Sequence, residues 1–154
     1  MLARLGTALF GLALATAVLV APAPAGAATA AQTYAASAFA TTNKVRANHD
    51  LKTLKADDCL RKAAVRQAKV MAGKSTIFHQ LLGPLLDGCT LLLVGENVAY
   101  GYATGKDVVR KGWMKSPGHR ANILRKGYTR MGIAARKSDD GTWYVAQVFG
   151  TPLP

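Results

Sequence analysis

Two histidines and one carboxylate are the side chains of this chain whose types and spacing could do chemistry. Glu96 and His119 lie on either side of Trp113, and His79 stands upstream of them. Two imidazoles and a carboxylate are the usual material of a divalent-metal site or of an acid–base centre. Their spacing matches no local metal signature such as HExxH. The three groups can therefore act together only if the fold brings them to one place.

The elements that position these residues follow an expected export signal. Arg4 precedes an almost uninterrupted apolar run over residues 5–20, and residues 25–27 form the small-residue pattern that signal peptidase recognises. We predict that residues 1–27 are a signal peptide, cleaved before Ala28. The alternative is an uncleaved membrane anchor, because the apolar run is close to the shortest that spans a bilayer.

The chain is strongly basic, with 20 Lys and Arg against 8 Asp and Glu and a net charge of +12 at pH 7. An exported protein with this charge is attracted to anionic surfaces, such as acidic lipid or cell-envelope polymers. The same charge could serve solubility alone. We expect no nucleic-acid ligand. A ribonuclease, in which one histidine acts as the base and the other as the acid, is an alternative that we also do not favour. No cluster of base-stacking aromatics accompanies the histidines.

The two cysteines of the chain, Cys59 and Cys89, agree with export. An even number of cysteines in an oxidising compartment favours a disulfide. Neither cysteine belongs to a CxxC motif, which argues against a catalytic or metal-bound thiolate. We expect a Cys59–Cys89 disulfide, whose loop closure would stabilise the fold by about 3–4 kcal/mol.

Two helices are expected to come first in the fold. Residues 33–48 show helical spacing of apolar positions, including Val45, with Arg46 on another face. A second helix starts at Asp57, because acids suit a helix N-terminus, and stops at Gly73. Its apolar stripe consists of Leu60, Ala64, Ala68 and Met71.

A leucine-rich stretch, residues 81–93, separates His79 from Glu96. A Cys59–Cys89 bridge would hold this stretch against the second helix. The sequence leaves open whether the stretch covers the core or forms an exposed apolar lid. Residues 91–102 are expected to lead into a strand that carries Glu96.

Short helices are expected around His119. Thr104 and Asp107 resemble a capping box that would start a third helix. Ser116 is expected to cap the next helix, with Pro117 at its first helical position. His119 would then lie in the first turns of a short helix, which is a well-fixed place for a ligand or a catalyst.

The end of the chain is expected to form a β-hairpin. Residues 131–135 and 143–149 alternate in character around a turn at 139–141. Gln147 is polar on an apolar strand and needs a buried partner, such as a site histidine or a water. Together with Asn97, it is a candidate for supporting the site. Helices followed by a hairpin predict an α+β domain with a small antiparallel sheet.

Taken in order, these residues resemble the CAP superfamily of cysteine-rich secretory, antigen 5 and pathogenesis-related proteins, also called SCP domains. The short bacterial branch is the most similar. The resemblance implies a three-layer α-β-α sandwich with a large central cleft. It assigns residues 28–40 to a lead-in and the start of the first helix, and residues 41–151 to the domain. The matching positions are Asn43, Arg46, Leu54, Leu60, Ala64, Ala68, Met71, Phe78, His79, 95–99, Trp113, 116–124, Gly132 and 144–150.

In this family the cleft holds two histidines and two acids, sometimes with a bound divalent ion. The resemblance places His79, Glu96 and His119 at three of these four positions. It places Ser116 where the second acid is expected. Zinc or another divalent cation is therefore expected to bind these three residues more weakly than it binds a full set of four.

Two functions follow from the resemblance. The first is a secreted, extracellular, monomeric binding module for a lipid or another amphiphile, which the leucine-rich stretch 81–93 and the basic charge suit. The second is a peptidase-like, metal-dependent hydrolase, in which His79, Glu96 and His119 would be the catalytic residues around a metal-bound water. We favour the first function and hence expect no enzymatic activity.

Overall fold

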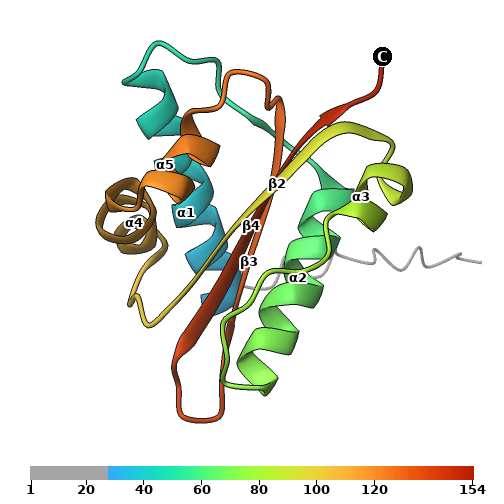
Figure 1. The fold of residues 1–154 in the computed structure, drawn as a ribbon. Helices are drawn as coiled ribbons and strands as arrows, with labels where there is room; N and C mark the ends of the chain where they lie inside the picture. The colour runs from blue at the N-terminus through green and yellow to red at the C-terminus, as the bar shows by residue number, and fades with distance from the viewer. Residues whose placement is uncertain (1–27) are drawn as a thin grey trace, which may run out of the picture.

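The computed structural model of the chain describes residues 28–154, so the predicted signal peptide lies outside the described residues. Helices cover both faces of a four-stranded sheet (Figure 1). The predicted α+β class and the three-layer α-β-α arrangement are confirmed. Over the part of the chain that the structure describes, no helix has the length and apolar character needed to cross a bilayer.

The first helix, α1 (Ala30–Ala47), begins earlier than the sequence predicted, because Thr29 caps it. The Gln32 backbone N–H donates to Thr29 Oγ1 at 3.2 Å, and the Thr29 N–H donates to the Gln32 side chain at 2.7 Å. The prediction that Arg46 lies on another face was wrong: it is fully buried, whereas Val45 is only partly buried. The buried stripe, with a residue at every fourth position, is Tyr34, Ala38, Thr42 and Arg46.

A two-residue strand, β1 (Lys55–Ala56), leads into helix α2 (Asp58–Gly73), where the sequence predicted a helix. Asp57 caps α2 by accepting a hydrogen bond from the Leu60 backbone N–H at 3.0 Å. A short helix, α3 (Gly83–Gly88), follows within the leucine-rich stretch.

The predicted disulfide joins Cys59, in the first turn of α2, to Cys89, at the end of α3. It holds the leucine-rich stretch 81–93 against α2. Both outcomes that the sequence left open occur in this stretch. Leu85 and Leu91 are buried, whereas Leu81 is 84% and Leu92 58% exposed.

Three longer strands complete the sheet, which has the order β1-β3-β4-β2. Strands β3 (Arg130–Lys137) and β4 (Trp143–Pro152) form the predicted hairpin. Strand β2 (Leu91–Tyr100) pairs antiparallel with β4, and only β1 runs parallel to its neighbour β3. The predicted antiparallel sheet therefore holds for the three long strands.

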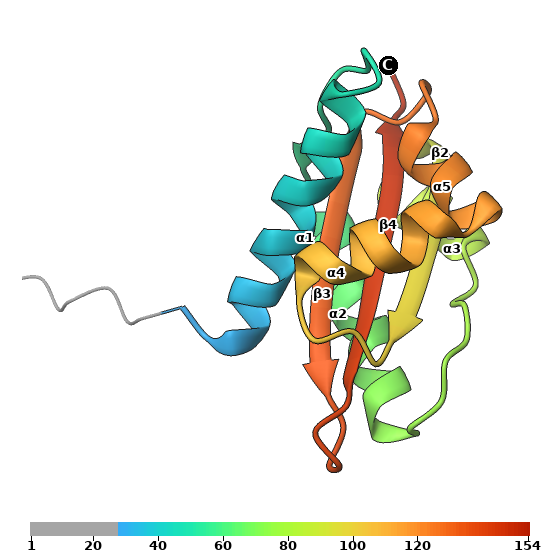
Figure 2. The ribbon, with the colours of Figure 1, turned by 90° about the vertical axis from the view of Figure 1, so that its left-hand side faces the viewer.

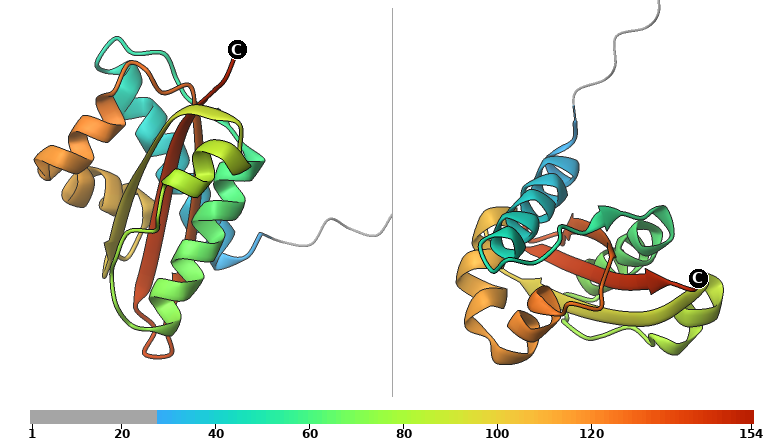
Figure 3. Two further views of the ribbon diagram at one scale, coloured as in Figure 1. Left: turned by 45° about the vertical axis from the view of Figure 1, so that its right-hand side comes forward. Right: turned by 90° about the horizontal axis from the view of Figure 1, so that it is seen from above.

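Helix α2 packs on one face of β3 and β4, while α1 and the helical segment 105–124 cover the other face (Figures 2 and 3). Each face has its own apolar core. Trp113 and Phe149 belong to the core under α1, and Leu60 and Met71 to the core under α2. The sheet is therefore buried on both sides, and it positions residues of both layers around β2.

The helical segment 105–124 contains four consecutive short pieces, of which the last, α5, carries His119. The predicted cap is present, since the Asp107 N–H donates to Thr104 Oγ1 at 3.0 Å. Ser116 occupies the position before α5, but the prediction that its side chain caps the helix was wrong. Pro117, at the first helical position, has a backbone conformation that suits the start of a helix, so α5 begins without a side-chain hydrogen bond from Ser116. The pieces are α4 (Gly105–Asp107), a π-helical turn (Val108–Gly112), a 3-10 turn (Trp113–Lys115) and α5 (Pro117–Leu124).

Candidate functional site

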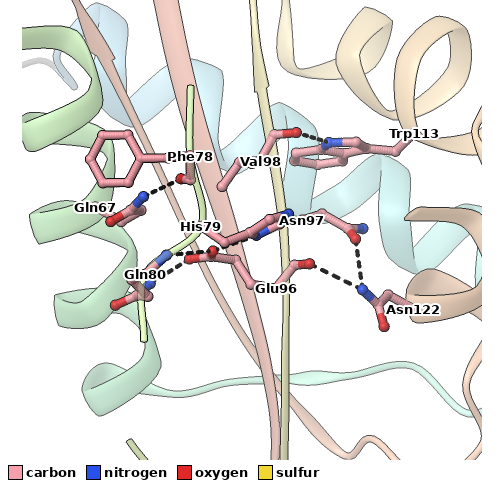
Figure 4. A network of polar contacts seen from close by, with 9 residues as sticks. All are labelled: Gln67, Phe78, His79, Gln80, Glu96, Asn97, Val98, Trp113 and Asn122. Carbon is pink, nitrogen blue, oxygen red and sulfur yellow. Dashed lines mark hydrogen bonds and ion pairs between the residues drawn. The ribbon is translucent and has the colours of Figure 1, made fainter. Parts of the chain in front are cut away.

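Glu96 lies in the middle of β2 with a fully buried side chain. A buried carboxylate is stable only when its oxygens are paired. Its Oε1 accepts hydrogen bonds from His79 Nδ1 at 2.8 Å and from the Gln80 backbone N–H at 3.2 Å (Figure 4). Its Oε2 accepts a bond from the Gln80 side-chain amide. Both carboxylate oxygens are therefore held by residues 79–80.

His79 reaches Glu96 from a loop that α2 holds in place. The side-chain amide of Gln67, on α2, donates to the backbone carbonyl of Phe78 (Figure 4). Because Glu96 accepts from Nδ1, the ring proton of a neutral His79 resides on Nδ1 and Nε2 is its acceptor. More than half of the His79 side chain is exposed. Glu96 thus orients an imidazole that remains open to solvent.

Side-chain amides form a second network on the opposite face of β2, since neighbouring strand residues point to opposite faces. Asn97 Nδ2 donates to Gln147 Oε1 and to the His119 backbone carbonyl, both at 3.1 Å. Asn122 Nδ2 donates to Asn97 Oδ1 and to the Glu96 backbone carbonyl, both at 3.0 Å. This network ties α5 to the strand that carries Glu96.

Gln147 has the buried partner that the sequence required, although the partner is not a histidine. Its Nε2 donates to Thr42 Oγ1, on α1, at 2.9 Å, and its Oε1 accepts from Asn97. Among the described residues, every buried side-chain nitrogen and oxygen has a hydrogen-bond partner. Gln147 therefore acts on His119 only through Asn97, as a link between α1, the sheet and α5.

Arg46 fixes the other end of α5. Its Nη1 donates to the backbone carbonyls of Ile123 at 2.7 Å and of Arg125 at 3.0 Å, and its Nε donates to the Lys52 carbonyl at 2.9 Å. The last carbonyls of a helix have no partner within the helix. The buried guanidinium therefore closes the C-terminal end of α5 and anchors it to α1.

His119 lies on α5, close enough to His79 for the two imidazoles to interact electrostatically. Burial lowers the pKa of His119 from its ordinary value, and positive charge on His79 lowers this pKa further. The structure thus brings His79 and Glu96 into direct contact. It places His119 nearby, in the helical layer on the other face of the sheet.

The three predicted ligands do not fit a metal ion in this arrangement. No group of three or more His, Cys, Asp or Glu side chains within residues 28–154 is arranged to hold one. The Glu96 oxygens already accept hydrogen bonds from residues 79–80, and Ser116 supplies no carboxylate. A carboxylate in this state suits the positioning of His79 better than metal binding.

Sequence reasoning missed three members of the site, namely Gln80, Thr42 and Arg46. Gln80 follows His79 directly, and that adjacency was the only available signal for its contact with Glu96. Thr42 and Arg46 are four residues apart, and that spacing was the signal for a shared buried face. Trp113 is a core residue whose Nε1 donates to the Val98 carbonyl at 3.2 Å (Figure 4).

Comparison with known proteins gives one family. Residues 39–149 match the model of the CAP family, described as the cysteine-rich secretory protein family. The protein YkwD of Bacillus subtilis is 35% identical over 116 residues, which are 71% of this chain and 44% of YkwD.

The solved structures that share the fold include two bacterial proteins. An extracellular protein containing an SCP domain from Bacillus anthracis is 26% identical, with a TM-score of 0.68 over 82% of this chain and 45% of that chain. A cysteine-rich secretory protein from Staphylococcus aureus is 25% identical, with a TM-score of 0.67 over 79% of this chain and 39% of that chain. The chain spans less than half the length of these two proteins and of YkwD.

Proposed function

Because this chain belongs to the CAP family of cysteine-rich secretory proteins, we propose that it is a secreted binding module for an amphiphilic anionic ligand, the acidic lipid of a membrane surface. Two similar bacterial structures are described as an extracellular protein and as a secretory protein, which supports action outside the cell. The net charge of +12 supports an anionic ligand.

The exposure of Leu81 and Leu92 carries the proposal. Single exposed leucines are common, but these two occupy one short stretch that the disulfide ties to α2. Leu153, also exposed, lies beside the start of β2, where its N–H donates to the Thr90 carbonyl at 3.0 Å. Full burial of a leucine side chain in lipid would contribute about 1.5–3 kcal/mol.

Basic side chains stand next to the same stretch. Leu93 pairs with Thr151 across the sheet, and the Thr151 hydroxyl donates to the backbone carbonyl of Gly127. The exposed Arg125 and Lys126 immediately precede Gly127. Near an anionic membrane each cation contributes about 1 kcal/mol of attraction. Cations that can meet lipid headgroups therefore lie near Leu93, at the β2 end of the leucine-rich stretch.

The second predicted function, a metal-dependent hydrolase, has no observation in its favour and stays a prediction. Its mechanism requires Glu96 as a metal ligand or as a base for a metal-bound water. The hydrogen bonds from residues 79–80 occupy both Glu96 oxygens. These contacts do not favour Glu96 as a metal ligand or as a general base.

Sedimentation with phosphatidylglycerol vesicles tests the proposed function. Leu81→Asp and Leu92→Asp should each weaken binding about tenfold, because a buried leucine is lost and a negative charge is added. Val70→Asp is the matched control, since Val70 is an exposed apolar residue on α2 outside the leucine-rich stretch. Equal partitioning of the wild type and both leucine variants would remove the lipid proposal.

A further inference from the structure

Strand β3 is paired on its outer side only at its beginning. Strand β1 pairs with β3 at Arg130 and Met131 alone. The Asp57 N–H donates to the Met131 carbonyl at 3.2 Å, so odd-numbered residues here direct their backbone polar groups away from β4. By the two-residue period of a strand, Ile133 and Ala135 do the same.

The outward backbone groups of Ile133 and Ala135 have no hydrogen-bond partner among residues 28–154. Yet Ile133 is only 6% and Ala135 only 3% exposed. Backbone N–H and C=O groups at such depth are normally paired, because leaving them unpaired is costly. Two donors and two acceptors, at the spacing of a strand, therefore line a recessed site.

A groove of about 860 Å3 runs along this edge. Helix α1 forms one wall, with Ala35 and Phe39, and helix α2 forms the other, with Val65. Figure 2 shows β3 as the strand next to α1, with α2 behind the sheet. The groove contains neither His79 nor Glu96, and it lies apart from the leucine-rich stretch. It is therefore a second surface, independent of the proposed lipid contact.

We propose that this groove binds an extended polypeptide segment of a partner protein, which joins the sheet as a further strand beside β3. The backbone of that segment supplies the partners that Ile133 and Ala135 lack. Its alternate side chains face α1 and α2, so apolar residues fit the walls.

Charge at one end of the groove adds a requirement for the segment. Arg136 is exposed, lines the groove and forms no ion pair with another residue of the described chain. An acidic residue at the corresponding end of the bound segment would meet this guanidinium. The partner is thus an extended segment with small or apolar side chains towards both walls and an acidic residue at one end.

Two other occupants fit the groove less well. An acyl chain could pack against the apolar walls, but it offers no hydrogen-bond donors or acceptors to the backbone of Ile133 and Ala135. A second copy of this protein cannot pair edge to edge, because α1 and α2 wall in β3 and would keep two recessed strands apart. A single extended segment fits between α1 and α2 and supplies hydrogen-bond partners to the backbone of β3.

Amide hydrogen exchange and peptide binding together test the proposal. The probe is a blocked heptapeptide of alternating valine and threonine with glutamate at one end, for the side of the groove where Arg136 lies. At saturation it should slow the exchange of the Ile133 and Ala135 amides at least about tenfold. Two further peptides carry N-methyl groups on either the odd or the even amides. A strand uses one set only, so one methylated peptide should bind about tenfold more weakly and the other unchanged.

Several results would overturn the inference. Equal binding of both methylated peptides, or exchange of Ile133 and Ala135 that the peptide leaves unchanged, would show that no strand is added. Protection by palmitate alone would identify a lipid groove. Protection that grows with protein concentration and without peptide would identify a second copy. Arg136→Glu should weaken the binding of the acidic peptide several-fold. Lys137→Glu, next to the groove, should leave this binding unchanged.

Discussion

Glu96 shows how one buried side chain organises a site. A carboxylate removed from water needs several donors, and residues 79–80 supply all of those that the structure shows. The same bonds set the tautomer and the direction of His79. Glu96 is therefore a positioning residue for His79.

His119 carries a pH dependence that can be tested directly. Burial first, and charge on His79 second, lower its pKa below the ordinary value of 6.5. As the pH falls, the unfolded chain therefore takes up this proton before the folded chain does. Its contribution to stability is full above about pH 6.5 and is lost as the pH falls below that value.

Urea unfolding between about pH 5 and 7 should show a smaller loss of stability on acidification for His119→Gln than for the wild type. His79→Gln should raise the pKa of His119 only partly towards 6.5, because burial remains, and NMR titration measures this pKa. Identical pH profiles for the wild type and His119→Gln would contradict the lowered pKa.

Arg46 is expected to be the most sensitive polar residue of α1. Arg46→Met leaves the buried carbonyl of Ile123, and those of Lys52 and Arg125, without their donor, which should cost about 3 kcal/mol. Lys44→Met, at an exposed position of the same helix, should change stability by less than about 0.5 kcal/mol. Chemical denaturation measures both values. Similar losses in the two variants would show that the guanidinium does not anchor α5.

At the scale of elements, local signals predicted most of the fold. The cap at Asp57 and the turn at 139–141 depend on residues close together in the chain, so α2 and the β3–β4 hairpin could be predicted. The hydrogen bonds of Arg46 could not be predicted, because the acceptors on Ile123 and Arg125 lie 77 and 79 positions away in the sequence. The contact of Gln80 with Glu96 likewise depends on the path of the loop relative to β2. No spacing of residues in the sequence predicts that path.

The contact between α2 and β3 depends on the lack of a side chain at Gly132. A Cβ there would lie 2.2 Å from the Arg61 backbone nitrogen, so α2 would have to move. Gly132→Ala should therefore destabilise the protein by about 2 kcal/mol in thermal or chemical unfolding. Gly118→Ala is the control, because its Cβ meets nothing within 4 Å. Equal stability of the two variants would disprove this close approach.

The disulfide joins the first turn of α2 to the end of α3. Cys59 and Cys89 close a loop with a sequence separation of 30, so Cys59→Ala with Cys89→Ala should lower stability by about 3–4 kcal/mol. Reduction of the wild type should have a similar effect in guanidinium unfolding. The exposed leucines of the stretch 81–93 should then lose their fixed positions, and vesicle binding should weaken as well. A double variant as stable as the wild type would show that packing alone holds α3.

At the scale of the whole molecule, two surfaces remain distinct. The leucine-rich stretch, with Arg125 and Lys126 nearby, belongs to one end of the β2–β4 pair. The open edge of β3 lies on the other side of the sheet, since the strand order is β1-β3-β4-β2. A protein with two such surfaces could contact a membrane and a polypeptide at once.

The affinity for vesicles of different charge tests the central claim most directly. At about 0.1 M salt, binding to phosphatidylglycerol vesicles should be at least tenfold tighter than binding to phosphatidylcholine vesicles, because the cations add to the leucines. Rising salt should weaken this preference without abolishing the leucine contribution. Equal affinity for both vesicle types, or no binding to either, would contradict an extracellular module for anionic amphiphiles.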